Sequence, residues 1–343
     1  MRLLLVNHEF TITGASTVLF RLAAHFRAVG HEVHIFPGNP ADGPMKARYE
    51  EAGIPVLAQA VLGGYDLALC NGIGTAMHVQ EIATHLPVIW FVHEAEVALN
   101  LLLKHNQMIQ AFAQAAAVVY QMPFQAEVLR SFTYQLDPRK FHVIPNGVNV
   151  PDALPTDLVP PKKRALRIVQ VASVETRKRP GDLIRAVARS GIDAECVFCG
   201  RIYALEDDAR EIAGKAPAQF RFTGEIESAL ALAWAQSADV FCLASSSETQ
   251  GIAAYEAALL GRPLLLSDLP CYRDVFAHGR NCLMFPPGRI DMLALSLGIY
   301  AVSPALRDEM GAAARHTARR FSNAAFYARF DALLTEVGSL PRG

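Results

Sequence analysis

Short apolar runs alternate with helix-like stretches along most of this chain of 343 residues. Runs such as Leu3–Asn7 and Val88–Val92 are separated by amphipathic stretches such as Ser16–Val29, and the alternation starts again at Leu166–Ala172. Between the two series, Val150–Ala165 holds four prolines and shows no periodicity, which is typical of a connector. Repeated βα units build parallel sheets covered by helices, so we expect an α/β protein with two doubly wound domains. Ligands of such sheets bind at the carboxyl ends of the strands, which predicts a cleft between the two domains.

The pattern also gives bounds for the individual elements. The expected strands are Leu3–Asn7, His31–Phe36, Leu67–Cys70, Val88–Val92, Ala117–Gln121, His142–Ile144, Leu166–Ala172, Ala194–Cys199, Phe220–Thr223, Asp239–Leu243 and Leu264–Ser267. The expected helices are Ser16–Val29, Lys46–Ala52, Thr75–Thr84, Val97–Ala115, Pro123–Phe132, Pro180–Arg189, Asp207–Lys215, Ala229–Gln236, Met292–Ala301, Pro304–Thr317 and Ala324–Val337, with a further one inside the segment treated below.

Composition excludes several classes of protein. The formal net charge of −1 gives no reason to expect nucleic acid as a partner. Six cysteines do not suit a disulfide framework in a chain this long, and Cys196 and Cys199 fall on opposite faces of an expected buried strand rather than in a metal or redox motif. No run reaches the roughly 18 uninterrupted apolar residues of a membrane span. The apolar Met1–Val6 is too short for a signal peptide and fits an opening strand, so we expect a cytoplasmic protein.

The segment Ser245–Pro270 carries the strongest functional pattern. Glu248 and Glu256 have seven residues between them, and Gly251 lies where an apolar strand gives way to an alanine-rich helix. A helix that begins near Gly251 offers free N–H groups and the positive end of its dipole to an anion. Glu248 precedes that anion site, and Glu256 lies about 7–8 Å along the helix axis beyond it. A ligand with hydroxyls on both sides of a diphosphate, such as a nucleotide-sugar, fits this order.

This segment resembles the Glu-x7-Glu signature of the retaining glycosyltransferases of family 4, which have the GT-B fold of two Rossmann-like domains. The chain departs from the usual form at Thr249 and Gln250, where Gly-Phe is common, and at Ala244, where proline is common. The resemblance implies that Glu256 binds the ribose hydroxyls and that Glu248 contacts the transferred sugar. It further implies that the backbone of Gly251, Ile252 and Ala253 binds the sugar and the diphosphate.

The resemblance also implies a division of the chain. Ile144–Val148 reads IPNGV, which is similar to the sequence that commonly closes the first domain in the family. We expect an acceptor-side domain at residues 1–155, a donor-binding domain at 156–320, and a final helix at 321–343 that returns to the first domain.

A basic turn follows the first strand of the second domain. Arg177 and Lys178 lie between that strand and the next helix, where cations suit a diphosphate. The turn resembles a family variant that supplies the basic pair for the donor phosphates, although Ala172-Ser173 stands where the commoner form has Gly-Arg. A solvated basic turn is the alternative.

Three further loops lie at strand ends where the family has site residues. His93 follows the strand Val88–Val92, where a family histidine lies close to the transferred sugar, although a lone histidine is more often structural; Glu94 or Glu96 beside it could contact an acceptor hydroxyl. Gly14 opens the first helix, where a family glycine loop approaches the phosphates; a plain N-cap by Thr13 or Ser16 is the alternative. Gly200 and Ile226 are assigned to the sugar phosphates and the base on resemblance and position alone.

Together with the resemblance, these residues predict a metal-independent hexosyltransferase that uses a UDP- or GDP-linked donor and a glycan, lipid-linked or small-molecule hydroxyl acceptor. The resemblance further implies that the enzyme is retaining. No Asp-x-Asp metal motif is present in the chain, and no cofactor is expected. A nucleotide-sugar epimerase of the same fold and a non-catalytic nucleotide-sugar-binding protein remain alternatives. An NAD-dependent reductase lacks support, because no Gly-x-Gly-x-x-Gly follows the first strand. The apolar stretch Val97–Leu103 beside Lys104 permits peripheral association with the inner face of a membrane, or equally a buried helix.

Overall fold

The computed structural model describes residues 1–38, 42–59 and 62–340 and divides the chain into two compact units. Unit 1 comprises Met1–Gly147 and Asn323–Gly343, and unit 2 comprises Val148–Ser322. Each unit contains one six-stranded sheet, and all the strand pairs among the described residues are parallel. The expected α/β class with two doubly wound sheets is therefore confirmed.

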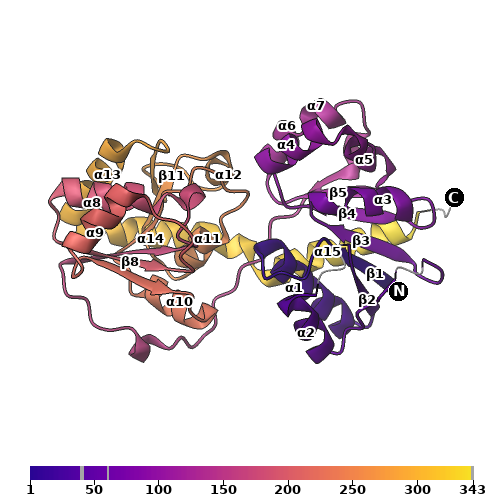
Figure 1. The fold of residues 1–343 in the computed structure, drawn as a ribbon, viewed down its shortest axis with the longest axis horizontal. Helices are drawn as coiled ribbons and strands as arrows, with labels where there is room; N and C mark the ends of the chain where they lie inside the picture. The colour runs from indigo at the N-terminus through magenta and orange to yellow at the C-terminus, as the bar shows by residue number, and fades with distance from the viewer. Residues whose placement is uncertain (39–41, 60–61, 341–343) are drawn as a thin grey trace. The chain divides into compact units, whose positions relative to one another are not determined.

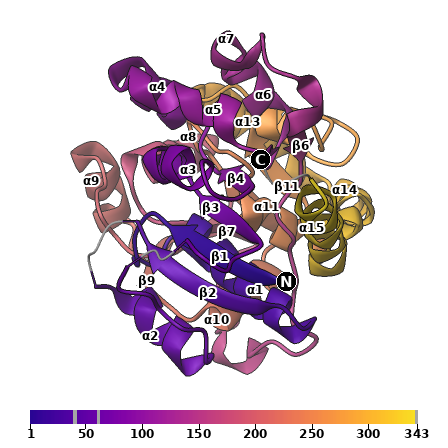
Figure 2. The same cartoon turned by 90° about the vertical axis from the view of Figure 1, so that its right-hand side faces the viewer.

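The sheet of unit 1 has the strand order β2-β1-β3-β4-β5-β6. Its strands are β1 (Arg2–Asn7), β2 (Glu32–Pro37), β3 (Leu67–Asn71), β4 (Val88–Val92), β5 (Ala117–Tyr120) and β6 (Phe141–Val143). Figure 2 shows β2, β1 and β3 beside one another in this order. Because β1 pairs with β2 on one side and β3 on the other, the crossover direction reverses between β1 and β3.

Helices cover both faces of this sheet. They are α1 (Gly14–Ala28), α2 (Pro44–Glu51), α3 (Ala76–Ile82), α4 (Glu96–Lys104), α5 (Gln110–Gln114), α6 (Pro123–Val128), α7 (Arg130–Thr133) and α15 (Asn323–Gly338). Successive residues of β1 enter different cores: Leu3 packs with α1 and α15, whereas Leu4 packs with α3 and α5. Figure 1 shows α15, the yellow helix at the end of the chain, alongside this unit's strands. Burial on both faces explains why the strands read as continuous apolar runs.

The sheet of unit 2 has the order β12-β11-β10-β7-β8-β9. Its strands are β7 (Leu166–Val171), β8 (Ala194–Cys199), β9 (Phe220–Gly224), β10 (Val240–Leu243), β11 (Leu264–Ser267) and β12 (Leu283–Phe285). The chain proceeds from β7 to β8 and β9, then returns to the other side of β7 as β10. This reversal makes the gap between β7 and β10 the topological switch point, where doubly wound sheets bind ligands outside the carboxyl ends of their strands.

Helices again flank the sheet of unit 2. They are α8 (Pro180–Ser190), α9 (Asp207–Lys215), α10 (Ser228–Gln236), α11 (Ile252–Leu259), α12 (Pro270–Arg273), α13 (Ile290–Val302) and α14 (Pro304–Ala318). Cys196 of β8 packs in the core that α8 and α13 share, whereas Cys199 packs with Trp234 on the opposite face. This confirms that the two thiols point to different faces. Burial raises the pKa of the Cys199 thiol to about 12, so this side chain behaves as a small apolar group.

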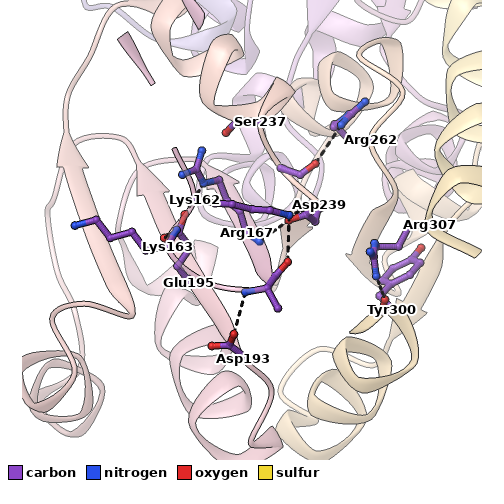
Figure 3. A network of polar contacts seen from close by, with 12 residues as sticks. Lys162, Lys163, Arg167, Asp193, Glu195, Ser237, Asp239, Arg262, Tyr300 and Arg307 are labelled. Carbon is purple, nitrogen blue, oxygen red and sulfur yellow. Dashed lines mark hydrogen bonds and ion pairs between the residues drawn. The ribbon is translucent and has the colours of Figure 1, made fainter. Parts of the chain in front are cut away.

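A buried ion pair lies near the amino ends of two strands of this sheet. Arg167 of β7 donates from Nε to Glu195 Oε1 of β8 at 2.6 Å and from Nη2 to the carbonyl of Pro160 at 2.7 Å. Both side chains are largely buried, and the guanidinium lies over the ring of Trp234. Figure 3 shows Arg167, Glu195 and Lys163 near one another, at the amino ends of β7 and β8. The hydrogen bond from Arg167 to the carbonyl of Pro160 holds the proline-rich connector at the edge of the sheet opposite to the switch point.

Two of the predicted helices were wrong. The predicted helix Val97–Ala115 is two helices, α4 and α5, separated at His105, whose φ of −130° is not helical. The break allows Phe112 to pack on Trp90, with ring centroids 4.7 Å apart. The predicted helix Pro123–Phe132 is likewise divided at Leu129 into α6 and α7, because Leu129 leaves the helical region and is fully buried.

The sequence pattern did not predict β12 and α12, because elements of three and four residues are too short to show a period. Among the described residues, no single helix has the length and apolarity of a membrane span. In this described part of the chain, one pair of helices, α13 with Pro304–Phe321, is long and apolar enough when taken together, but the pair is bent by 105°.

Candidate active site

Two loops meet at the switch point of unit 2, after β7 and after β10. The loop after β7 contains a 3₁₀ turn at Thr176–Lys178 and ends at Arg179, whose left-handed backbone (φ 47°) leads into Pro180 at the start of α8. Ser246 in the loop after β10 donates its N–H to the carbonyl of Arg177 at 2.8 Å. We call the group Arg177, Lys178, Ser245, Glu248 and Gly251 the switch-point site.

Glu248 lies at the centre of the switch-point site. Its side chain is only 7% exposed, and it forms an ion pair with Lys178 through Oε1 and with Arg177 through Oε2 at 3.4 Å. Ser245 also donates its hydroxyl to Glu248 Oε1 at 2.8 Å. A buried carboxylate costs several kcal/mol of desolvation unless cations and hydrogen bonds compensate, and all three partners come from these two loops. The first glutamate and the basic pair predicted from the sequence therefore form one cluster.

The two cations differ in their access to solvent. Lys178 is 15% exposed and is committed to Glu248, whereas the side chain of Arg177 is 46% exposed. Arg177 also donates to the carbonyl of Ser247 at 3.0 Å and to Glu175 at 3.2 Å, so its orientation is set from both loops. An oriented, half-exposed guanidinium is suited to bidentate binding of a phosphate.

Gly251 is required at its position for two separate reasons. Its φ of 71° is in the left-handed region, and a Cβ there would lie 2.3 Å from the hydroxyl oxygen of Tyr272. Tyr272 is fully buried, and its hydroxyl has no hydrogen-bond partner among the described residues. Burial, with a smaller contribution from the charge of Glu248, raises its pKa well above the usual range. Tyr272 thus stands directly behind the cap of α11 and was not identified from the sequence.

Helix α11 begins at Ile252 with Gly251 as its N-cap, which confirms the expected helix start. The first turn is closed by Ala254, whose N–H donates to the carbonyl of Gly251 at 2.9 Å. The N–H groups of Ile252 and Ala253 precede this bond at the positive end of the helix dipole. Glu256 lies one turn further along and is partly buried. The helix therefore follows the switch-point site directly in the chain, with its amino end toward it.

Gly200 and Ile226 lie at the neighbouring strand ends. Gly200 has a φ of 152°, and a Cβ there would lie 2.2 Å from the carbonyl oxygen of Ala172, so the loops after β7 and β8 approach closely. Its N–H donates to the carbonyl of Gly224 at 3.1 Å. Ile226 packs against the core that contains Trp234, beside α10. Both residues therefore lie along the carboxyl edge that includes the switch-point site.

In unit 1, a row of buried polar side chains runs along the carboxyl edge of the sheet. Asn7 ends β1, Asn71 ends β3, His93 follows β4 and Gln121 follows β5. His93 Nε2 lies 2.7 Å from Asn71 Oδ1, and His93 Nδ1 contacts the side-chain amide of Gln121. Burial lowers the pKa of His93 to about 3, so the ring is neutral near pH 7. His93 thus lies at the predicted strand end, with both ring nitrogens engaged inside unit 1.

Glu94 lies next to this row. Its Oε2 accepts hydrogen bonds from the N–H groups of Ile73 at 2.9 Å and His93 at 3.0 Å. Burial raises the pKa of this carboxyl despite these bonds. Glu96, by contrast, is exposed in the first turn of α4.

Gly14 is the first residue of α1, and a Cβ there would meet no atom within 4 Å. The N-cap is Thr13, whose side chain accepts a hydrogen bond from the N–H of Ser16 at 3.2 Å. The N-cap interpretation of this segment is therefore correct as local structure, and it leaves Gly14 accessible at the amino end of α1.

Asn7, Asn71 and Gln121 were missed because each continues an apolar strand in the sequence. The available signal was their position, since a polar residue that closes a buried parallel strand lies at the ligand-binding edge. Among the described residues, no group of three or more His, Cys, Asp or Glu side chains could hold a metal ion.

Each of the two units is built on one doubly wound parallel sheet, and comparison with known proteins specifies the family. The family described as Glycosyl transferases group 1 matches residues 158–317, and the one described as Glycosyltransferase Family 4 matches residues 12–151. Together the two family models cover most of the chain, which belongs to the glycosyltransferases of the GT-B fold that carry both regions.

Relatives and solved structures agree with this assignment. The chain is 29% identical over 184 residues to the phosphatidyl-myo-inositol mannosyltransferase of Mycobacterium leprae, covering 52% of this chain and 49% of the relative. It is 26% identical over 235 residues to the D-inositol 3-phosphate glycosyltransferase of Jonesia denitrificans, covering 62% and 55%. The chain thus spans about half the length of the curated relatives it matches. Anabaena Alr3699/HepE in complex with UDP superposes with a TM-score of 0.80 at 17% identity over 98% of this chain and all of that one. Sucrose-phosphate synthase from Thermosynechococcus elongatus gives 0.76 at 17% identity over 98% and 99%.

Proposed function

We propose that this protein is a retaining glycosyltransferase that moves a hexose from a UDP- or GDP-linked donor to an acceptor hydroxyl. The observation that carries the proposal is the switch-point site, where Arg177 and Lys178 surround a buried Glu248 directly before the amino end of α11. Family membership supports a glycosyl group as the group that is transferred. The bound UDP of the Anabaena protein supports a nucleotide donor.

The donor is held by unit 2 in this proposal. Its diphosphate accepts hydrogen bonds from Arg177, Lys178 and the N–H groups of Ile252 and Ala253. Glu248 then turns its carboxylate to sugar hydroxyls as the phosphates take over its cations, and Glu256 accepts from the ribose hydroxyls. Gly200 lies beside the phosphates and Ile226 beside the base, as the family resemblance assigns them. In unit 1, the resemblance assigns Gly14 to the donor phosphates and His93 to the neighbourhood of the transferred sugar.

The chemical step places negative charge on the departing diphosphate and positive charge on the sugar ring. Cations and helix N–H groups that already point at the phosphate stabilise this charge without reorganising, which is the largest contribution that such a site makes. Retention follows if the acceptor oxygen attacks the same face. The bond from the anomeric carbon to the acceptor oxygen forms, the bond to the phosphate oxygen breaks, and the acceptor proton passes to that phosphate oxygen. The cations Arg177 and Lys178 provide the charge for this step, so the proposal requires no metal ion and no cofactor.

The acceptor is a hydroxyl compound, and association with a membrane surface is part of the proposal. The named acceptors of the relatives above are inositol compounds, which makes polyols and their lipid forms the first candidates. In α4, Ala98 and Leu102 are buried, whereas Val97 is 57% and Leu103 is 67% exposed. Lys104 follows them at the end of the helix, so apolar and cationic groups lie together as an interfacial helix requires.

The test is turnover with defined donors and acceptors. The protein is incubated with UDP- and GDP-hexoses together with myo-inositol, its phosphate and phosphatidylinositol vesicles, and products are followed by mass spectrometry and by the anomeric proton signal. The proposal predicts transfer with the donor's anomeric configuration. An epimerised donor without an acceptor, or nucleotide binding with no product across the panel, would instead support the two alternatives. Vesicle sedimentation of wild type and the Leu103→Ser variant tests membrane association separately.

A further inference from the structure

The hydrogen bonds of the polar row Asn7, Asn71, His93 and Gln121 in unit 1 run in one direction. This direction fixes which ring nitrogen of His93 carries a proton. Two backbone carbonyls determine it, because a carbonyl oxygen only accepts hydrogen bonds. Asn7 donates from Nδ2 to the carbonyl of Glu9 at 2.8 Å, so its Oδ1 faces Asn71. Asn71 donates from Nδ2 to the carbonyl of Ala15 at 3.3 Å and to Asn7 Oδ1 at 3.1 Å. The Oδ1 of Asn71 therefore faces His93.

An oxygen that faces a ring nitrogen requires that nitrogen to carry the proton. Asn71 Oδ1 lies 2.7 Å from His93 Nε2, so Nε2 is protonated and donates. In a neutral imidazole, Nδ1 then carries the lone pair and accepts from the amide of Gln121. A second proton on Nδ1 would oppose this N–H. Each of the four side chains is no more than 7% exposed, so water is poorly placed to replace any of these bonds.

We propose that Asn7, Asn71 and Gln121 are positioning residues that hold His93 as the neutral tautomer with its proton on Nε2. This inference rests on the proposed function, and it deepens it: the ring of His93 neither gives nor takes a proton during sugar transfer. The low pKa that burial imposes on His93 agrees with this assignment. The acceptor proton then leaves by the departing phosphate oxygen, as written above.

The surroundings of the ring contain few groups that could reverse this state. Phe91 packs on one side, with ring centroids 4.0 Å apart, and Phe330 of α15 packs on Phe91. The carboxylate of the adjacent Glu94 accepts hydrogen bonds from the backbone N–H groups of Ile73 and His93. The same row reaches the start of α1, because Asn7 also donates to the hydroxyl of Ser16 at 3.3 Å. Through its bond to the carbonyl of Ala15, Asn71 thus connects His93 with the first turn of α1, which contains Gly14.

The test reads the tautomer directly by NMR of protein labelled with ¹⁵N in its histidines. The chain has 11 histidines, and the signals of His93 are those that His93→Gln removes. We expect a protonated Nε2 and an unprotonated Nδ1 from pH 8 to pH 6. A proton on Nδ1 or a doubly protonated ring in this range overturns the proposal. Because this measurement needs no substrate, it stays decisive even if the protein transfers no sugar, and a failed proposed function is recognised separately by the turnover assay.

Two variants test the positioning residues. Asn71→Asp keeps an acceptor for Nε2 but adds a negative charge and loses the donor to Ala15, so we expect a doubly protonated His93 at pH 6 and at least a tenfold lower kcat. Asn149→Asp makes the same substitution at an exposed position of unit 2 and should change neither. If Asn71→Asp does not fold, Gln121→Met decides. Asn71 still requires the proton on Nε2, but no N–H then opposes a second proton on Nδ1, so we expect a larger doubly protonated fraction of His93 at pH 6 than in wild type. Gln135→Met, at an exposed position, is its control. A wild-type His93 spectrum in the folded variants overturns the role of Asn71 and Gln121.

Discussion

Substitution of Gly251 tests whether the cap of α11 is built as described. Gly251→Ala must place a side chain at φ 71°, which costs about 1–2 kcal/mol for a residue other than glycine. The new Cβ would also lie 2.3 Å from the Tyr272 hydroxyl oxygen and 2.9 Å from two ring carbons, and overpacking of this kind costs about 1–3 kcal/mol. We therefore expect the free energy of unfolding of unit 2 to fall by about 2–5 kcal/mol.

The partner substitution Tyr272→Phe separates the two contributions. The Tyr272 hydroxyl is buried and has no partner in the described part of the chain, so its removal alone should be nearly neutral or stabilising. In the double variant, the closest contact is removed while the backbone strain remains. We expect the pair to be non-additive, with about 1 kcal/mol of the loss recovered.

The assay is urea unfolding followed by tryptophan fluorescence. The chain has two tryptophans, Trp90 in unit 1 and Trp234 in unit 2, so a Trp90→Phe background lets Trp234 report on unit 2 alone. Gly214→Ala in α9 is the control, because a Cβ there meets nothing within 4 Å and should stabilise the helix by about 0.5–1 kcal/mol. Two results would contradict this description of the α11 cap. One is a Gly251→Ala protein as stable as wild type, and the other is a Tyr272→Phe protein that loses the roughly 1 kcal/mol of a normal hydrogen bond.

Three further predictions concern the ligand and the pH. Glu256→Ala should weaken nucleotide-sugar binding by about 1–3 kcal/mol in calorimetry, whereas Glu211→Ala on the exposed face of α9 should not; equal affinities would count against ribose binding by Glu256. Transfer activity should survive EDTA, and a loss that Mg²⁺ or Mn²⁺ restores would contradict the metal-independent mechanism. The pKa of His93 is lowered to about 3 in the folded protein against about 6.5 when unfolded, so its stabilising contribution is complete above pH 6.5 and is lost as the pH falls, by up to about 1.4 kcal/mol per pH unit. His93→Gln should reduce this pH dependence of unfolding by close to one proton between pH 4 and 6, and an unchanged dependence would show that His93 is not buried in its neutral form.

The sequence predicted the architecture well because both sheets are parallel and buried on both faces. Strands such as β4 and β8 therefore appear as unbroken apolar runs with sharp ends. It failed where a local break depends on tertiary packing, as at His105 and Leu129, since nothing in the helical period marks these positions. It also failed at β12, which three residues cannot distinguish from a loop.

For the site, spacing located single groups but not their pairing. The Glu-x7-Glu segment predicted the start of α11, and the basic turn identified Arg177 and Lys178 as one candidate group. Both cations hold Glu248 because β7 and β10 are neighbours in the sheet. Local patterns cannot predict this pairing, since 68 residues separate the end of β7 from the start of β10. The polar row of His93 was invisible for the same reason, because its members end four different strands.

The most direct test of the account is nucleotide binding by a double variant of the switch-point site. Calorimetry compares wild type, Arg177→Ala with Lys178→Ala, and a control with Lys163→Ala and Arg164→Ala. The control removes the same charges just before β7, at the opposite edge of the same sheet, where Figure 3 shows Lys163. Charged hydrogen bonds contribute about 1.5–3 kcal/mol each, so the account predicts at least about a hundredfold loss of UDP or GDP affinity in the first double variant and little change in the control. Equal affinities in the two double variants, or no binding of either nucleotide by wild type, would contradict it.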